Sequence, residues 1–150
     1  MSDIALDGII WINDREDGGD VVLFGQADPA PINIDEVVAR FDRADNGRAA
    51  QALRDLGFPS AINLMSSYGG HAADLAAWLK DAAINTDRDL RLQYLAGMGL
   101  NAEEQDQIHF ELMEARRISP GLFVGSAERL AELHKAIDDN KRRPRDPDGK

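Results

Sequence analysis

The sequence contains no cysteine. Disulfide bonds, thiolate nucleophiles and cysteine-ligated zinc sites are therefore excluded. It also lacks any uninterrupted apolar run of about 18 residues, the length that indicates a transmembrane helix. The opening residues, MSDIALDGIIWIND, have neither the basic start nor the long apolar stretch of a signal peptide. We therefore expect a soluble, cytoplasmic protein with no membrane partner.

Basic residues are scarce relative to acidic ones. The chain has 17 Lys and Arg residues against 27 Asp and Glu residues, and its formal net charge is −10 at pH 7. Nucleic acids and anionic membranes carry negative charge themselves, so an acidic chain is repelled by both. We predict no nucleic-acid partner. A basic protein surface or a small cation would be easier to bind.

The chain is long enough to bury one core, with 150 residues of which 43% are hydrophobic. We predict an α+β fold, in which residues 1–137 form a single helix-rich module with an N-terminal β-hairpin. The remaining residues 138–150, DDNKRRPRDPDGK, are mostly charged and hold two prolines. A segment of this composition has little apolar surface to bury, so we expect a disordered tail.

Two β-branched and aromatic runs near the N-terminus predict the hairpin. They are GIIWI and DVVLFGQ, and the turn-rich segment NDREDGG separates them. A single hairpin is marginally stable in water, so these strands must pack on helices or on another sheet. The outer strand edge would be unpaired in isolation. It could extend the sheet of a partner subunit or pair with a second copy of the chain.

Apolar residues that recur every three to four positions predict five helices. The first opens at Asn33, which has the spacing of a capping box with Glu36, and the last opens at Ser126. The other three are expected over residues 47–57, 71–82 and 101–117. Their apolar faces, in chain order, are Val37, Val38 and Phe41; Ala50, Leu53 and Leu56; Leu75, Trp78 and Leu79; Ile108, Leu112 and Ala115; and Leu130, Leu133 and Ile137.

Three segments have less definite patterns. INLMSSYGG, residues 62–70, fits either a short helix or a loop, which Gly69 and Gly70 would end. LRLQYLAG, residues 90–97, fits a strand or a helical turn, and its alternation slightly favours the strand. ISPGLFVGS, residues 118–126, is interpreted as a connector, since it lacks the lysine of a phosphate-binding loop.

Local motifs predict no catalytic residue, cofactor or metal. The acidic residues of the hairpin turn lack the glutamate that would complete an EF-hand calcium loop. No His-Glu-x-x-His pair occurs among the three histidines. The serine pair in LMSSYGG lacks the glycine spacing of a nucleophile elbow. The residues concerned are Asp14, Glu16, Asp17 and Asp20 in the turn; the histidines His71, His109 and His134; and the serines Ser66 and Ser67.

A polar run, Asn85-Thr86-Asp87-Arg88-Asp89, lies between two apolar segments. The short side chains of Asn, Thr and Asp bond nearby backbone N–H groups, so such a run usually caps or turns the chain. We interpret it as a structural corner.

The order of several segments resembles the C-terminal part of spermidine synthase-like proteins, the polyamine aminopropyltransferases. The segments are GGDVVLFGQADPAPI, LAAWLKDAAINTDRDLRLQYLAG and PGLFVGSAERLAELHKAI, and the resemblance spans most of residues 18–137. In that family an Asn-Thr-Asp segment is usually continued by a proline and a Glu-Tyr pair. Asn85, Thr86, Asp87 and Tyr94 match it here, while Leu90 stands near the usual proline and Gln93 replaces the glutamate.

The resemblance implies the C-terminal portion of a methyltransferase-like α/β fold. The family's glycine-rich substrate-binding loop and catalytic aspartate have no counterpart in this sequence. We therefore expect a structural or partner-completing subunit without activity alone, in which residues 85–87 and Tyr94 form a corner at the edge of a pocket. Its partner would be a catalytic subunit or a second copy. The alternative is a free-standing acidic interaction module that binds a basic protein or a polyamine.

Overall fold

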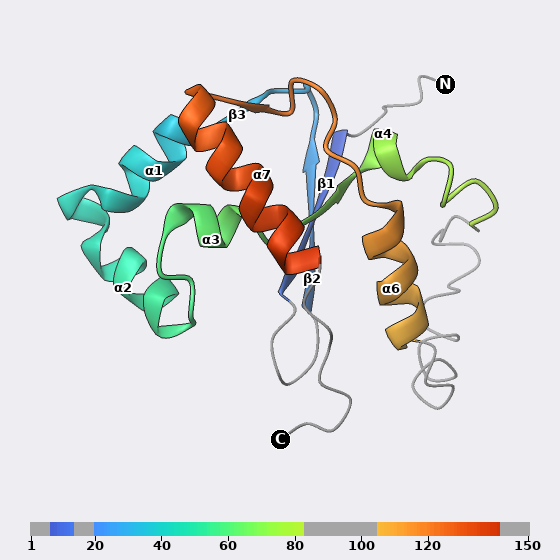
Figure 1. The fold of residues 1–150 in the computed structure, drawn as a ribbon, viewed down its shortest axis with the longest axis horizontal. Helices are drawn as coiled ribbons and strands as arrows, with labels where there is room; N and C mark the ends of the chain where they lie inside the picture. The colour runs from blue at the N-terminus through green and yellow to red at the C-terminus, as the bar shows by residue number, and fades with distance from the viewer. Residues whose placement is uncertain (1–6, 14–19, 83–104, 142–150) are drawn as a thin grey trace.

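The computed structural model describes residues 7–13, 20–82 and 105–141. These form both helices and strands, which confirms the predicted α+β class (Figure 1). The strands are β1 (Asp7–Asn13), β2 (Asp20–Gln26), β3 (Ile32–Asn33), β4 (Tyr68–His71) and β5 (Phe123–Val124). The helices are α1 (Ile34–Asp42), α2 (Gly47–Asp55), α3 (Ala61–Met65), α4 (Ala72–Leu75), α6 (Gln105–Ala115) and α7 (Ala127–Lys141), with a 3₁₀ turn at Ala44–Asn46. Within the described ranges, none of the helices has the length and apolar character needed to cross a membrane.

The two N-terminal strands form the predicted hairpin. β1 and β2 pair antiparallel along their whole length, from Asp7 opposite Gln26 to Asn13 opposite Asp20. β4 pairs antiparallel with the other side of β1, which gives the strand order β2-β1-β4. A separate two-stranded sheet joins β3 to β5 in parallel. β1 is therefore the central strand of the larger sheet.

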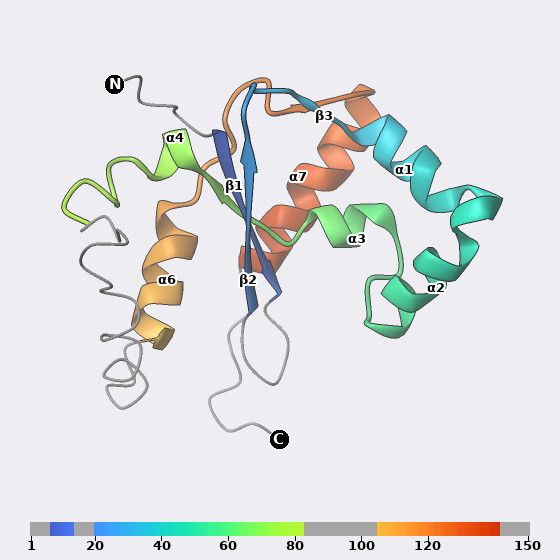
Figure 2. The same cartoon turned by 180° about the vertical axis from the view of Figure 1, so that it is seen from behind.

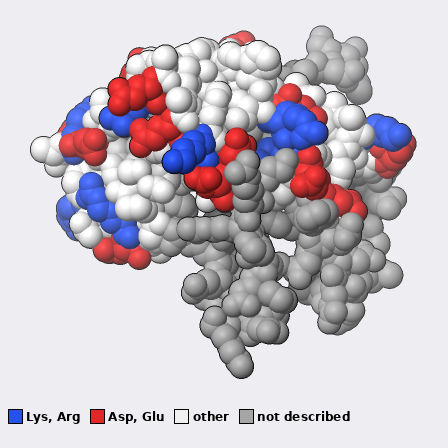
Figure 3. Space-filling view, in the orientation of Figure 1, with Lys and Arg blue, Asp and Glu red and all other residues white. Residues whose placement is uncertain are grey.

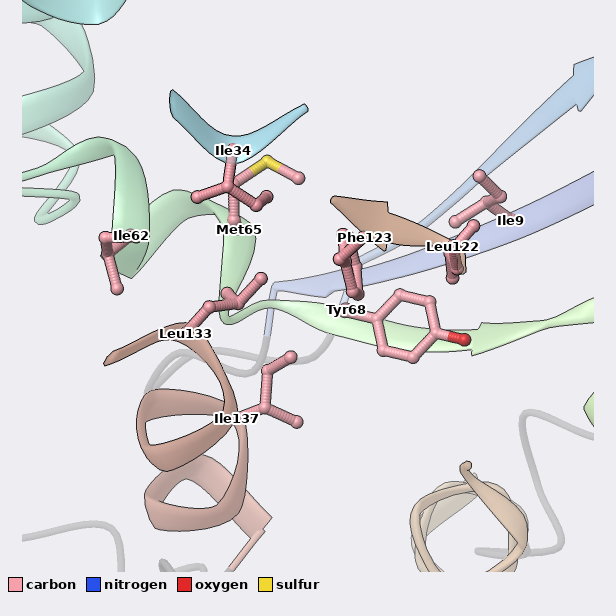
Figure 4. Packing of buried hydrophobic residues seen from close by; sticks show 9 residues of the cluster. All are labelled: Ile9, Ile34, Ile62, Met65, Tyr68, Leu122, Phe123, Leu133 and Ile137. Atoms are coloured by element: carbon pink, nitrogen blue, oxygen red, sulfur yellow. The ribbon is translucent and has the colours of Figure 1, made fainter. Parts of the chain in front are cut away.

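Side chains of β1 alternate between two apolar layers. Ile9 and Trp11 pack into the main core, and Ile10 and Ile12 pack on the opposite face with residues of α4 and α6. Figures 1 and 2 show α7 on one side of the sheet and α6 on the other. The buried members of the main core are Ile9, Ile34, Ile62, Met65, Tyr68, Leu122, Phe123, Leu133 and Ile137 (Figure 4).

Helix α1 begins at the predicted capping box, and helix α7 begins at the predicted serine. The backbone N–H of Glu36 donates to Asn33 Oδ1 at 3.3 Å, and Asn33 Nδ2 donates to Glu36 Oε1 at 3.3 Å. At α7, the Ser126 carbonyl accepts the first helical bond from Leu130 N–H at 3.0 Å. The Asp35 carboxylate accepts from the Ser126 backbone N–H at 2.6 Å and from its hydroxyl at 2.8 Å. The start of α1 therefore holds the start of α7.

The short helix, one of the two interpretations of residues 62–70, is confirmed for the first part of the segment by α3, but a strand that neither interpretation predicted follows it. β4 contains Gly69 and Gly70, which therefore do not end the segment. A Cβ atom added at Gly69 would lie 2.6 Å from Cδ1 and Cγ1 of Ile12. Glycine is thus what allows β4 to approach β1 closely enough to pair. The pairing of β4 with β1 joins segments far apart in the sequence, so a local sequence pattern does not predict it.

The helix predicted over residues 71–82 is much shorter. α4 ends at Leu75, which is fully buried, and turns follow it, so Leu79 is 42% exposed. Two other residues of the predicted apolar faces are not buried. Leu56 lies just beyond the end of α2 and is 64% exposed, and Ile108, near the start of α6, is 51% exposed. Apolar spacing indicated a helix face at these positions, but both side chains are exposed, and none of the described elements covers them.

The C-terminal part follows the prediction more closely. α6 ends at Ala115, two residues before the expected end, and Leu112 is buried. The connector that follows contains the short strand β5. The predicted inner face of α7 is confirmed, with Leu133 and Ile137 almost fully buried. α7 continues through Lys141, beyond the expected boundary at residue 137.

Candidate functional site

Strand β2 is an edge strand with an apolar sequence. It lies at one end of the β2-β1-β4 order, and within the described ranges no strand pairs with its outer side. Four consecutive apolar side chains are exposed in it: Val21 52%, Val22 47%, Leu23 73% and Phe24 56%. We call this surface, residues 21–24 together with the free strand edge, the β2 edge.

The exposed residues of the β2 edge lie on both faces of the sheet. Val22 and Phe24 stand opposite Trp11 and Ile9, whose side chains enter the main core on the α7 side. Since directly opposite residues share a face, these two side chains point to the α7 side.

Val21 and Leu23 stand opposite Ile12 and Ile10, which pack toward α4 and α6. β1 is thus covered on both faces, whereas neighbouring β2 is open on both. Among the described residues, the helical layers on either side of the sheet end before they reach β2.

This arrangement is unusual for a sheet that ends at β2. An edge strand in a solvated sheet normally alternates polar and apolar residues or carries charges that prevent pairing. A continuous apolar run is typical of a strand covered on both faces inside an α/β sheet. The free edge also presents backbone N–H and C=O groups that can accept another strand. Chemically, the β2 edge is suited to sheet extension rather than catalysis.

A second feature is a chain of four polar side chains beside β1 and β4. His71 Nε2 contacts Asp7 Oδ1, His71 Nδ1 lies 3.1 Å from Ser119 Oγ, and Ser119 Oγ donates to Asp74 Oδ2 at 2.5 Å. The side chains of His71 and Asp7 are only 13% and 12% exposed. A cavity of about 220 Å³ lies beside them, lined also by the prolines at positions 29, 31 and 120.

Serine, histidine and aspartate in contact suggest a nucleophilic site, but the direction of the serine hydrogen bond argues against it. The Ser119 hydroxyl has one proton, and it donates to the Asp74 carboxylate. A nucleophilic serine would instead direct that proton at the imidazole of His71, which contacts Asp7 through its other ring nitrogen. The cluster therefore ties β1, β4, α4 and the connector before β5 together.

Burial also controls the titration of two groups in the core. Tyr68 is fully buried, its ring packs edge-on against Trp11 and Phe123, and its hydroxyl donates to the Arg117 carbonyl at 3.0 Å. Desolvation by burial, and then the Asp74 carboxylate, raise the pKa of Tyr68 far above its usual range. Burial likewise lowers the pKa of the Arg116 guanidinium, which Asp138 and Tyr68 partly offset.

The residues of the family resemblance, Asn85, Thr86, Asp87 and Tyr94, lie outside the described ranges. Across the ranges that are described, no group of three or more His, Cys, Asp or Glu side chains could hold a metal ion. No family model, curated protein or solved structure matches the chain. The unpaired hairpin edge was anticipated from the sequence. The cluster around His71 was not, because its members are far apart in the chain and form no motif.

Proposed function

We propose that this chain is a non-catalytic module that completes a larger α/β sheet through the β2 edge. The observation that carries the proposal is the exposure of four consecutive apolar side chains, on both faces of an edge strand whose outer side pairs with no described strand. A strand added to the free edge would satisfy its backbone groups. Helices brought by the same partner would cover Val22 and Phe24 on one face and Val21 and Leu23 on the other.

The class of partner comes from the resemblance to spermidine synthase-like proteins. In this proposal the module is the C-terminal part of an aminopropyltransferase. The rest of that enzyme supplies the glycine-rich loop and the catalytic aspartate. Attack of an amine on a sulfonium carbon needs two positioned substrates and a base, and these would come from the completing body. The corner at Asn85-Thr86-Asp87, with Tyr94, would lie at the rim of that pocket.

The test is complementation of a truncated enzyme. A spermidine synthase-like protein that lacks its corresponding C-terminal segment is mixed with this chain, and aminopropyl transfer from decarboxylated S-adenosylmethionine to putrescine is measured. We expect no transfer by this chain alone and restored transfer by the mixture. Leu23→Lys should reduce the restored rate by about tenfold or more, because the charge would be buried at the junction.

The matched control is Leu56→Lys, which places the same charge on another exposed leucine, 64% exposed against 73% for Leu23, away from β2. It should leave complementation unchanged. Transfer by the chain alone would refute the non-catalytic assignment. A mixture without transfer, or equal effects of the two lysine variants, would refute the assigned partner.

A second candidate is an acidic module that binds a basic protein or a polyamine, and the net charge of −10 favours it. On the face shown in Figure 3, however, acidic and basic side chains of the described residues are interspersed. Mixed charges give a weaker directional field than a single-signed surface. This candidate predicts binding that weakens steeply with salt, whereas binding through the apolar β2 edge should change little.

A further inference from the structure

A cavity of about 380 Å³ lies between the end of α6 and the second half of α7. Its lining combines basic groups, apolar walls and one carboxylate: Arg116, Arg117, Ile118, His134, Ile137 and Asp138. The His71 cluster and the β2 edge contribute no residue to it. In a chain with a large excess of acidic residues, a cavity with two arginines and one histidine against one aspartate is a local reversal of charge.

Arg116 is the unusual member of this cavity, because it is charged and only 5% exposed. Its Nη1 donates to the Tyr68 carbonyl at 2.8 Å and its Nη2 to the Ile137 carbonyl at 3.0 Å. Both acceptors are neutral, and a guanidinium has five N–H donors. Among the residues that the structure describes, no carboxylate lies within ion-pair distance of it. Asp138, which lines the same cavity, interacts electrostatically with the guanidinium but offsets the cost of its burial only in part, so an anion in direct contact with Arg116 would be stabilised.

The other residues that line the cavity indicate which kind of anion would fit it. Arg117 is exposed, and its Nη1 donates to the carbonyls of Glu114 and Arg116. Ile118 and Ile137 offer apolar surface, which a hydrated inorganic ion would not use. Asp138 repels negative charge, and it repels a dianion more than a monoanion. The cavity therefore suits one negative charge attached to an apolar body.

We propose that this cavity binds a small organic carboxylate. The carboxylate oxygens accept from the arginines, which match their planar geometry, and the apolar body contacts the two isoleucines. The bound carboxylate gives Arg116 an ion-pair partner in direct contact, which none of the described residues provides.

Butanoate is the probe, and its dissociation constant is measured by NMR titration of the full chain. Arg117→Gln removes a lining charge at an exposed position and should weaken binding by about tenfold. Asp138→Asn removes the repulsion and should strengthen binding by about threefold. The matched controls are Arg48→Gln on α2 and Asp139→Asn on α7, which change the net charge equally outside the cavity lining. Neither control should alter the dissociation constant.

Two further probes fix the class of ligand. Butylammonium has a similar apolar body with the opposite charge and should not bind. Phosphate at equal ionic strength should bind more weakly than butanoate, because it gains nothing from the isoleucines. The proposal is overturned if butanoate does not bind, if phosphate binds as tightly, or if Asp138→Asn and Asp139→Asn have equal effects. The variants change exposed residues and should stay folded. A change in the dissociation constant would therefore not be caused by unfolding.

Discussion

The buried phenol of Tyr68 should make the protein lose stability at alkaline pH. In the native state the pKa of Tyr68 is raised, chiefly by burial, whereas an unfolded tyrosine ionises near about pH 10. Above that pH the unfolded chain loses a proton that the native chain retains, so the free energy of unfolding falls as pH rises. The stabilising contribution is complete below the unfolded pKa and is lost above it.

The expected change in the free energy of unfolding depends on one proton, that of the Tyr68 phenol, and on one hydrogen bond. At about pH 11, one unit above the unfolded pKa, the linkage removes about 1.4 kcal/mol relative to neutral pH. Tyr68→Phe cannot ionise, but it loses the hydrogen bond to the Arg117 carbonyl, which should cost about 1 kcal/mol at neutral pH. The variant should therefore be less stable at neutral pH. The two stability curves should meet between about pH 10.5 and 11.

Urea unfolding at a series of pH values measures both curves. Tyr94→Phe is the control, since it removes the only other tyrosine of the chain and leaves Tyr68 as the sole phenol. In that variant phenolate absorbance should appear only as the protein unfolds. If wild type and Tyr68→Phe lose stability with the same slope above pH 10, Tyr68 is not the group responsible and the reasoning fails.

Three further changes test the packing and the interface, each by urea unfolding. Gly69→Ala should cost about 1–3 kcal/mol because its methyl group would overlap Ile12, while Gly47→Ala, with no atom within 4 Å of the added carbon, should be neutral or slightly stabilising. Ser119→Ala should cost about 1–3 kcal/mol, because it removes the contacts to both His71 and Asp74; an unchanged stability would mean that the cluster does not hold these elements together. Leu23→Lys should change the stability of the isolated chain by no more than about 0.5 kcal/mol, since Leu23 is 73% exposed, and a larger loss would show that the β2 edge is covered within the chain.

The elements that sequence predicted correctly are those whose signals are local. The hairpin follows from two β-branched runs around a turn, α1 from the Asn33–Glu36 capping box, and α7 from Ser126 with its apolar stripe. Each of these signals lies within a few residues of the element it specifies.

The elements that were missed depend on contacts between distant segments. β4 is a strand only because it pairs with β1 across more than 50 residues of chain, and its glycines, read locally, indicate a break. β5 is two residues long and pairs with β3. The His71 cluster joins positions 7, 71, 74 and 119, and no spacing rule connects them. Contacts between distant segments determine β4, β5 and the His71 cluster. Patterns of neighbouring residues therefore could not predict them.

The apolar run of β2 is a functional signal as well as a structural one. Its β-branched and aromatic content predicts a strand. Its lack of alternation indicates more, because Val21 to Phe24 cannot all face one core. Either the strand is covered on both faces in the chain, or it is covered by something else. The exposure of all four side chains argues against the first alternative and supports the proposed junction with a partner.

The exposure of β2 on both faces also distinguishes the two partners proposed for the β2 edge, a second copy of the chain and an α/β protein. In a two-fold pairing of β2 with a second copy, Leu23 would stand opposite itself and Val22 opposite Phe24 of the second copy, while Asp20 would face Gln26 without charge repulsion. Such a dimer satisfies the backbone edge, but each copy's helical layers end at β1, so both faces of the paired strands remain thinly covered. A partner that brings its own helices covers the edge and both faces together. Protection of Val22 and Leu23 side chains from solvent, measured in each assembly, should therefore be greater with the α/β partner.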